Sequence, residues 1–211
     1  MDTLQLLIDA VINGDENRVK VIALEGITKG VKAADIMSKG LIAAMDKVGE
    51  KMEAEDMFIP EVLMSARAMS AGVEIIKPHL KEDDVQGRGV VVIGSAQGDL
   101  HDIGKNLVKL LMEGAGFSVI DLGTDVKPEK FLAAVHENNA DIVGISALLT
   151  TTMLMMKKVI EALESEGLRD QVKVIVGGAP VTKEFAKEIG ADCYGADAGS
   201  AVRIAKSLLE K

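Results

Sequence analysis

The sequence predicts an α/β protein: an N-terminal four-helix bundle followed by a doubly wound, parallel, five-stranded sheet. Residues 1–80 carry apolar side chains at helical spacing in four successive segments. From residue 89 onward, short apolar runs alternate with amphipathic segments of helix length. A polar stretch that ends in glycine, KEDDVQGRG, lies between these halves. We therefore expect a helical domain over 1–80, a linker over 81–88 and an α/β domain over 89–211.

The helices of the first domain are predicted from apolar spacing and from residues that begin or end helices. Asp15 can cap the second helix, whereas Gly26 and Gly30 are expected to break it. Pro60 suits the first turn of the fourth helix, and Pro78 should end it. Short connections between four helices predict an antiparallel bundle. The expected helices cover about 3–12, 15–25, 32–53 and 60–77.

Strands that are apolar along their whole length predict a parallel sheet covered by helices on both faces. Five such strands alternating with helices predict a flavodoxin-like, Rossmann-type domain with strand order 2-1-3-4-5. The expected strands are 89–95, 117–123, 141–146, 172–178 and 191–195. The expected helices are about 104–114, 128–138, 152–166, 181–189 and 198–210.

Composition excludes several classes of function. The formal net charge of −9 argues against a nucleic-acid-binding surface, which needs clustered lysine and arginine. Cys193 is the single cysteine, so no disulfide can form within the chain. No signal sequence and no apolar run approaching about 20 residues is present, which argues against a membrane partner. The expected location is the cytoplasm.

Three loops are predicted to converge on one edge of the sheet. DLHDIGKN (99–106) follows the first strand, SALLTTT (146–152) follows the third, and Gly177 and Gly178 follow the fourth. In doubly wound sheets, ligands bind beyond the carboxyl ends of the strands where the strand order reverses. The candidate site is therefore at this edge.

His101 is the candidate metal ligand at this edge. A neighbouring carboxylate, Asp99 or Asp102, could fix the tautomer of its ring and make the other ring nitrogen a better donor to a metal. The other two histidines, His79 and His136, fall outside these loops. A bare zinc site needs three or four protein ligands. One histidine suffices only for a metal that brings most of its own ligands, as in a tetrapyrrole.

At this point the residues resemble the signature of cobalamin-binding domains of the base-off, His-on type. The gaps between the three motifs, 41 residues (105–145) and 28 residues (149–176), suit that family. The segment VGEKMEAEDMFIPEVLMSARAM (48–69) resembles the cap helices over the corrin in methionine synthase. The matching motifs are Asp99-x-His101-x-x-Gly104, Ser146-x-Leu148 and Gly177-Gly178.

The resemblance implies a cofactor and a role for each residue. The cofactor would be cobalamin or a related cobamide, with His101 as the lower axial ligand of cobalt. Asp99 and Thr152 would extend from His101 as a hydrogen-bonded relay. The implied cofactor-binding residues are Asp99, His101, Asp102, Ile103, Gly104, Ser146, Leu148, Thr150, Gly177 and Gly178.

The residues themselves leave simpler alternatives open. Asp99 could be a turn residue, and Asp102 a helix cap rather than a cofactor contact. Thr152 could cap the helix that follows it. Gly177 and Gly178 could form a tight turn after a strand.

The resemblance also implies a function. The chain resembles the corrinoid proteins of three-component methyltransferase systems, which carry a methyl group on cobalt. Its partners would be a substrate-specific methyltransferase, an acceptor methyltransferase and a reductive activase. The alternatives are a cobalamin-dependent sensor, a mutase small subunit and, from another class, a receiver-like signalling domain with Asp121 as its acceptor carboxylate. The methyl donor is not predicted.

Overall fold

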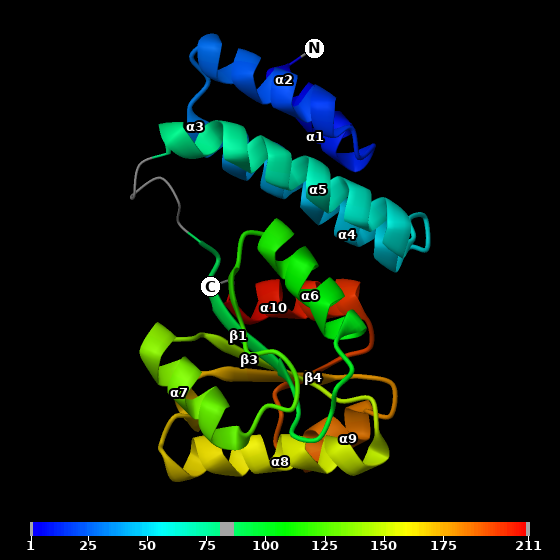
Figure 1. Ribbon diagram of the computed structural model, residues 1–211, viewed down its shortest axis with the longest axis vertical. Coiled ribbons are helices and arrows are strands. Elements are labelled where there is room, and N and C mark those ends of the chain that lie inside the picture. Colours follow the sequence, from blue (N-terminus) through cyan, green and yellow to red (C-terminus); the bar gives the residue numbers. More distant parts are fainter. Residues whose placement is uncertain (1, 81–86, 210–211) are drawn as a thin grey trace. The chain divides into compact units, whose positions relative to one another are not determined.

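The computed structural model describes residues 2–80 and 87–209 (Figure 1). The chain divides into two compact units. One comprises Met1–Gly87 with Gly114–Gly116, and the other comprises Arg88–Glu113 with Phe117–Lys211. Residues 81–86 of the predicted linker lie outside the described residues.

The first unit is helical. Helix α2 packs on α5, and α1 packs on α2 and α4. Buried Leu7, Val19, Leu41 and Val62 contribute to its core. Segments α3, η1 and α4 follow one another without a break, so together they form the predicted third helix, with a π-helical stretch in its middle. The bounds are α1 Thr3–Ile12, α2 Glu16–Thr28, α3 Ala33–Asp35, η1 Ile36–Ile42, α4 Ala43–Glu53, α5 Ile59–Ile76 and the 3₁₀ turn η2 Lys77–His79.

The second helix is longer than predicted because Gly26 does not break it. Asp15 caps α2 as expected, and its carboxylate accepts the Arg18 N–H at 3.0 Å. A Cβ atom on Gly26 would lie 3.1 Å from the Ile36 side chain and 3.3 Å from that of Thr3. The glycine therefore serves close helix packing, and α2 continues to Thr28.

The second unit contains a five-stranded, wholly parallel sheet with strand order β2-β1-β3-β4-β5, which confirms the predicted order. The strands are β1 Val90–Ser95, β2 Ser118–Asp121, β3 Ile142–Ser146, β4 Lys173–Gly177 and β5 Cys193–Gly195. The helices are α6 Ile103–Gly114, α7 Pro128–Asn138, α8 Thr150–Ser165, α9 Lys183–Glu188 and α10 Ala198–Leu209, with a 3₁₀ turn η4 Arg169–Gln171.

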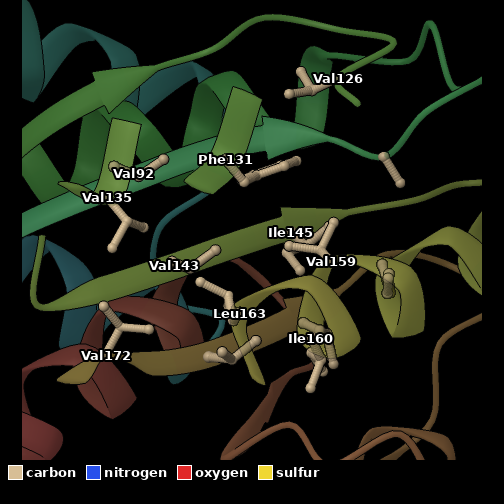
Figure 2. Close-up of a cluster of buried hydrophobic side chains, with 14 of the residues drawn as sticks. Val92, Val126, Phe131, Val135, Val143, Ile145, Val159, Ile160, Leu163 and Val172 are labelled. Atoms are coloured by element: carbon tan, nitrogen blue, oxygen red, sulfur yellow. The ribbon is translucent and has the colours of Figure 1, made fainter. Parts of the chain in front are cut away.

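Helices cover both faces of this sheet. In Figure 1, α6 and α10 lie on one side of the strands, and α7, α8 and α9 lie on the other. Figure 2 shows the core beneath the second group, where Phe131 of α7 and Ile160 of α8 accompany Val143 and Ile145 of β3. Burial of both strand faces explains why these strands are apolar along their length.

The strand register places the three predicted loops together. Ser95 of β1 is paired with Ser146 of β3, and Ser146 is paired with Gly177 of β4. These residues end their strands, so the three loops that follow them begin at the same edge of the sheet.

Among the described residues, no helix is long and apolar enough to span a membrane.

Candidate cofactor-binding site

Asp99 is the centre of the hydrogen-bond network at this edge. Its side chain is fully buried, in the loop between β1 and α6. Oδ1 accepts the main-chain N–H of His101 at 3.0 Å and the ring Nδ1–H of His101 at 2.8 Å. Oδ2 accepts the Leu148 N–H at 2.7 Å and the Thr152 hydroxyl at 2.6 Å. Asp99 thus joins the loop after β1 to the loop after β3.

This network keeps Asp99 ionised. Burial alone would raise the pKa of its carboxyl group. The bonds donated by Thr152, the Leu148 N–H and the His101 N–H and ring outweigh burial and hold the pKa far below its usual range. A buried carboxylate with four donors is therefore present at neutral pH.

His101 presents one ring nitrogen for a ligand. A carboxylate only accepts hydrogen bonds, so the contact with Asp99 places the proton on Nδ1 and leaves the lone pair on Nε2. The His101 side chain is 51% exposed. Within residues 2–80 and 87–209, no group of three or more His, Cys, Asp or Glu side chains could hold a metal ion. His101 can therefore offer a single nitrogen donor, and these residues offer no complete set of metal ligands.

Thr152 lies inside the first turn of α8, so it is not the N-cap residue, but its hydroxyl does help to cap this helix. Helix α8 begins at Thr150, the N-cap position belongs to Leu149, and the Thr152 hydroxyl accepts the Leu149 N–H at 3.3 Å. The same hydroxyl donates to Asp99. Thr152 is only 6% exposed. The geometry of an Asp99–Thr152 relay is thus built into the protein itself.

We expect Thr152→Val to destabilise the cofactor-free protein by about 1.5–3 kcal/mol, because a hydrogen bond to a buried charged group is lost. Thr152→Ser keeps the hydroxyl and should cost less than about 1 kcal/mol. Urea unfolding followed by circular dichroism measures both. Equal losses in the two variants would show that the hydroxyl does not support Asp99.

The glycines at and just after the end of β4 allow neighbouring segments to approach closely. A Cβ atom on Gly178 would lie 1.9 Å from the Ala147 carbonyl oxygen, and one on Gly177 would lie 2.8 Å from that of Gly195. Gly178 also has φ +125°, a backbone conformation that other residues rarely adopt. These contacts explain the two glycines by packing within the protein. A role in lining a space for the cofactor stays a prediction.

Gly178→Ala should therefore destabilise the protein by about 2–4 kcal/mol, from steric overlap and backbone strain together. Gly167→Ala is the matched control, because Gly167 has φ +68° but no atom within 4 Å of its would-be Cβ. That control should cost only about 1 kcal/mol. Similar losses at the two positions, in urea unfolding, would contradict the close-approach argument.

Large apolar side chains are exposed around His101. The exposed fractions are 74% for Leu100, 85% for Ile103 and 39% for Leu148, whose N–H binds Asp99. Clustered exposed apolar residues are typical of binding surfaces. One nitrogen donor among apolar side chains fits a large, flat macrocycle that supplies its own equatorial ligands. Sequence reasoning included Ile103 and Leu148 but missed Leu100, although its place beside His101 was a usable signal.

The remaining predicted residues surround this surface. Asp102 directly precedes α6, and its main-chain carbonyl accepts the Asn106 N–H at 2.7 Å, which supports the helix-start alternative. A Cβ atom on Gly104 would meet nothing within 4 Å. Ser146 ends β3, and Thr150 begins α8. Cofactor contacts by these residues stay predictions.

One ionic cluster beside the site was not anticipated. Lys105, in the first turn of α6, is only 3% exposed, and its Nζ donates to Asp121 Oδ1 at 2.6 Å and to Asn106 Oδ1 at 2.7 Å. Asp121 also accepts the Gly123 N–H at 2.9 Å. Asp121, the carboxylate considered for a receiver-like function, is thus bound to a buried lysine that anchors α6 to the end of β2.

Comparison with known proteins assigns a class to this fold and site. The B12 binding domain family matches residues 89–203, and a second B12 binding domain family matches residues 3–77. The cofactor of the chain is therefore cobalamin or a related corrinoid.

The relatives define the family more closely. A dimethylamine corrinoid protein of Methanosarcina barkeri is 46% identical over 209 residues, covering 99% of this chain and 98% of that protein. The crystal structure of the methanol:cobalamin methyltransferase complex MtaBC from the same organism contains a chain with TM-score 0.89 and 32% identity, covering 98% of this chain and 79% of that one. A cobalamin-binding protein of Desulfitobacterium hafniense gives TM-score 0.79 and 34% identity, covering 98% of each chain. The chain belongs to the family of corrinoid proteins.

Proposed function

We propose that this chain binds its corrinoid in the base-off, His-on form and carries a methyl group between two methyltransferases. The observation that carries the proposal is the His101–Asp99 pair, in which a buried carboxylate accepts the hydrogen bond of Nδ1–H and leaves Nε2 available. When bound, the corrinoid supplies a cobalt centre that can accept and release a methyl group. His101 would supply a nitrogen donor to that centre, and the surrounding residues would supply its environment.

Each residue of the network has a separate task. His101 would donate to the cofactor through Nε2, and Asp99 would fix the tautomer and orientation of the ring. Leu148 and Thr152 hold the Asp99 carboxylate through its second oxygen. We assign Asp102, Ile103, Gly104 and the residues around Ser146, Thr150, Gly177 and Gly178 to contacts with the corrin and with the displaced nucleotide tail.

Asp99 remains a carboxylate at neutral pH, because its hydrogen-bond donors hold the pKa of this group far below its usual range. The carboxylate can therefore keep the ring proton of His101 on Nδ1, so that Nε2 is the nitrogen available to the cofactor.

The helical unit exposes large apolar side chains near the start of α5. Phe58, Ile59 and Met64, at the start of α5, are 66%, 49% and 51% exposed. Exposed apolar side chains of this kind are typical of binding surfaces, and we propose that they help to exclude water from the bound cofactor. The family resemblance of residues 48–69 to cap helices supports this role.

The partners we propose are a substrate-specific methyltransferase, an acceptor methyltransferase and a reductive activase. The relative named for dimethylamine, and the solved complex of a methanol:cobalamin methyltransferase, support the methyltransferase partners. A methylamine is the first methyl donor to test. A cytoplasmic location stays a prediction.

The test loads the full-length chain with hydroxocobalamin, reduces it anaerobically, and adds a methylated amine with its methyltransferase. The visible spectrum should change from that of reduced to that of methylated cobalamin, and reverse when an acceptor methyltransferase and thiol are added. Methylation by no donor in a panel of methylamines, methanol and betaines would contradict a carrier function. Light-dependent changes in assembly would then favour the sensor alternative.

A further inference from the structure

We propose that Ser95 and Asp125 are positioning residues for His101, which hold the main chain of its loop from two sides. This inference rests on the proposed axial role of His101. It concerns residues outside the sequence motifs, and neither residue hydrogen-bonds the imidazole.

Ser95 fixes the carbonyl group of His101. Its hydroxyl donates to the His101 carbonyl oxygen at 2.7 Å, and the residue is fully buried at the end of β1. The donor is itself held in place, because the Ser95 N–H donates to the Gly123 carbonyl at 3.0 Å and the Ser95 carbonyl accepts the Val126 N–H at 3.0 Å. The carbonyl of His101 is therefore tied to the rigid part of the sheet.

Asp125 holds the main chain just before Asp99 and at its carbonyl group. Its N–H donates to the Asp99 carbonyl at 2.9 Å, and its Oδ1 accepts the Gly98 N–H at 2.7 Å. To make both bonds, Asp125 adopts φ +51°, a left-handed conformation that aspartate tolerates better than most residues. A strained residue in the loop after β2 thus holds the loop after β1.

The two sets of contacts complete the fixation of the histidine. The Asp99 carboxylate binds the N–H and the ring of His101, whereas Ser95 binds its carbonyl. Asp125 holds the main chain of the residue that bears the carboxylate. Displacement of either main-chain anchor would rotate or shift the ring away from the direction that axial ligation requires, because metal ligands depend on the groups that orient them.

The experiment measures the ratio of His-on to His-off protein in the full-length chain loaded with Co(II) cobalamin. Electron paramagnetic resonance distinguishes the forms by the nitrogen splitting of the axial ligand. Ser95→Ala and Asp125→Ala should each lower this ratio about fivefold, the size expected for the loss of one or two main-chain anchors. Ser95→Thr and Asp125→Asn retain the hydroxyl donor and the oxygen acceptor, and should recover most of the wild-type ratio.

The outcomes separate positioning from general stabilisation. If the alanine variants unfold at lower temperature but keep the wild-type ratio when loaded, the two residues are only structural and the proposal is wrong. Should Ser95→Ala fail to fold, the Asp125 pair decides, since Asp125 is exposed. An absent nitrogen splitting in the wild-type protein would instead overturn axial ligation by His101 itself.

Discussion

Replacing His101 with alanine should abolish axial nitrogen ligation and lower methyl transfer by at least about 100-fold, because loss of groups that merely orient a metal ligand already costs 10- to 100-fold. The variant should fold, since the His101 side chain is half exposed and the bonds of its ring are confined to Asp99. Corrinoid binding would weaken without vanishing, because the apolar surface around Leu100 and Ile103 remains. Visible spectra and methyl-transfer rates of the loaded protein measure these effects.

His136→Ala is the matched control. His136 lies in the last turn of α7, outside the loops at the carboxyl edge of the sheet. Its replacement should leave the spectrum and the transfer rate unchanged. Equal losses in the two variants would contradict a specific role for His101.

The second large effect is expected at Asp99. In the Asp99→Asn variant, the amide side chain would keep one acceptor oxygen and turn its NH₂ group toward two of the four donors that the carboxylate now binds. Buried donors left without partners cost about 1–3 kcal/mol each, so Asp99→Asn should destabilise the cofactor-free protein by about 2–5 kcal/mol. Urea unfolding at pH 7 measures the loss.

The pH dependence of that loss tests the ionisation of Asp99. The pKa of Asp99 is lowered in the folded protein, so its contribution to stability is fully present above the unfolded value of about 3.9. It declines as the pH falls below about 4, toward the folded pKa. The stability difference between wild type and Asp99→Asn should therefore shrink as the pH falls from about 4 toward the folded pKa of Asp99. A difference that stays the same or grows over that range would contradict a carboxylate stabilised by its donors.

Periodicity and strand composition predicted the main features of the fold. Wholly apolar runs alternating with helical patterns predicted both the parallel sheet and its strand order, and the order alone placed DLHDIGKN beside SALLTTT. The hydrogen bond from the Leu148 N–H to Asp99 joins these two loops directly, as that prediction requires. The predicted helix end at Gly26 was wrong, because the local preference of glycine to end a helix is overridden by tertiary packing against Ile36. The π-helical stretch Ile36–Ile42 carries no pattern in single-sequence periodicity that separates it from an α-helix.

Contacts of the site that involve main-chain groups could not be predicted from the sequence. Ser95 and Asp125 act on carbonyl and N–H groups of other loops, and such contacts depend on the path of the backbone rather than on a spacing of residue types. The burial of Lys105 could not be predicted for a related reason, because it follows from pairing with Asp121, sixteen positions away in the sequence. The contacts of Asp99 with His101 and Thr152 were predicted, whereas the main-chain contacts of Ser95 and Asp125 and the burial of Lys105 were found only in the structure.

The central claim, that His101 is the axial ligand of cobalt, is tested most directly by isotopic labelling. The full-length protein is produced with ¹⁵N-histidine, loaded with unlabelled Co(II) cobalamin, and studied by electron paramagnetic resonance. Ligation by His101 predicts that the triplet splitting seen with ¹⁴N becomes a doublet, and that the doublet disappears in His101→Ala while persisting in His136→Ala. A triplet that survives the labelling would show that the cofactor's own base remains on cobalt, and would contradict the account.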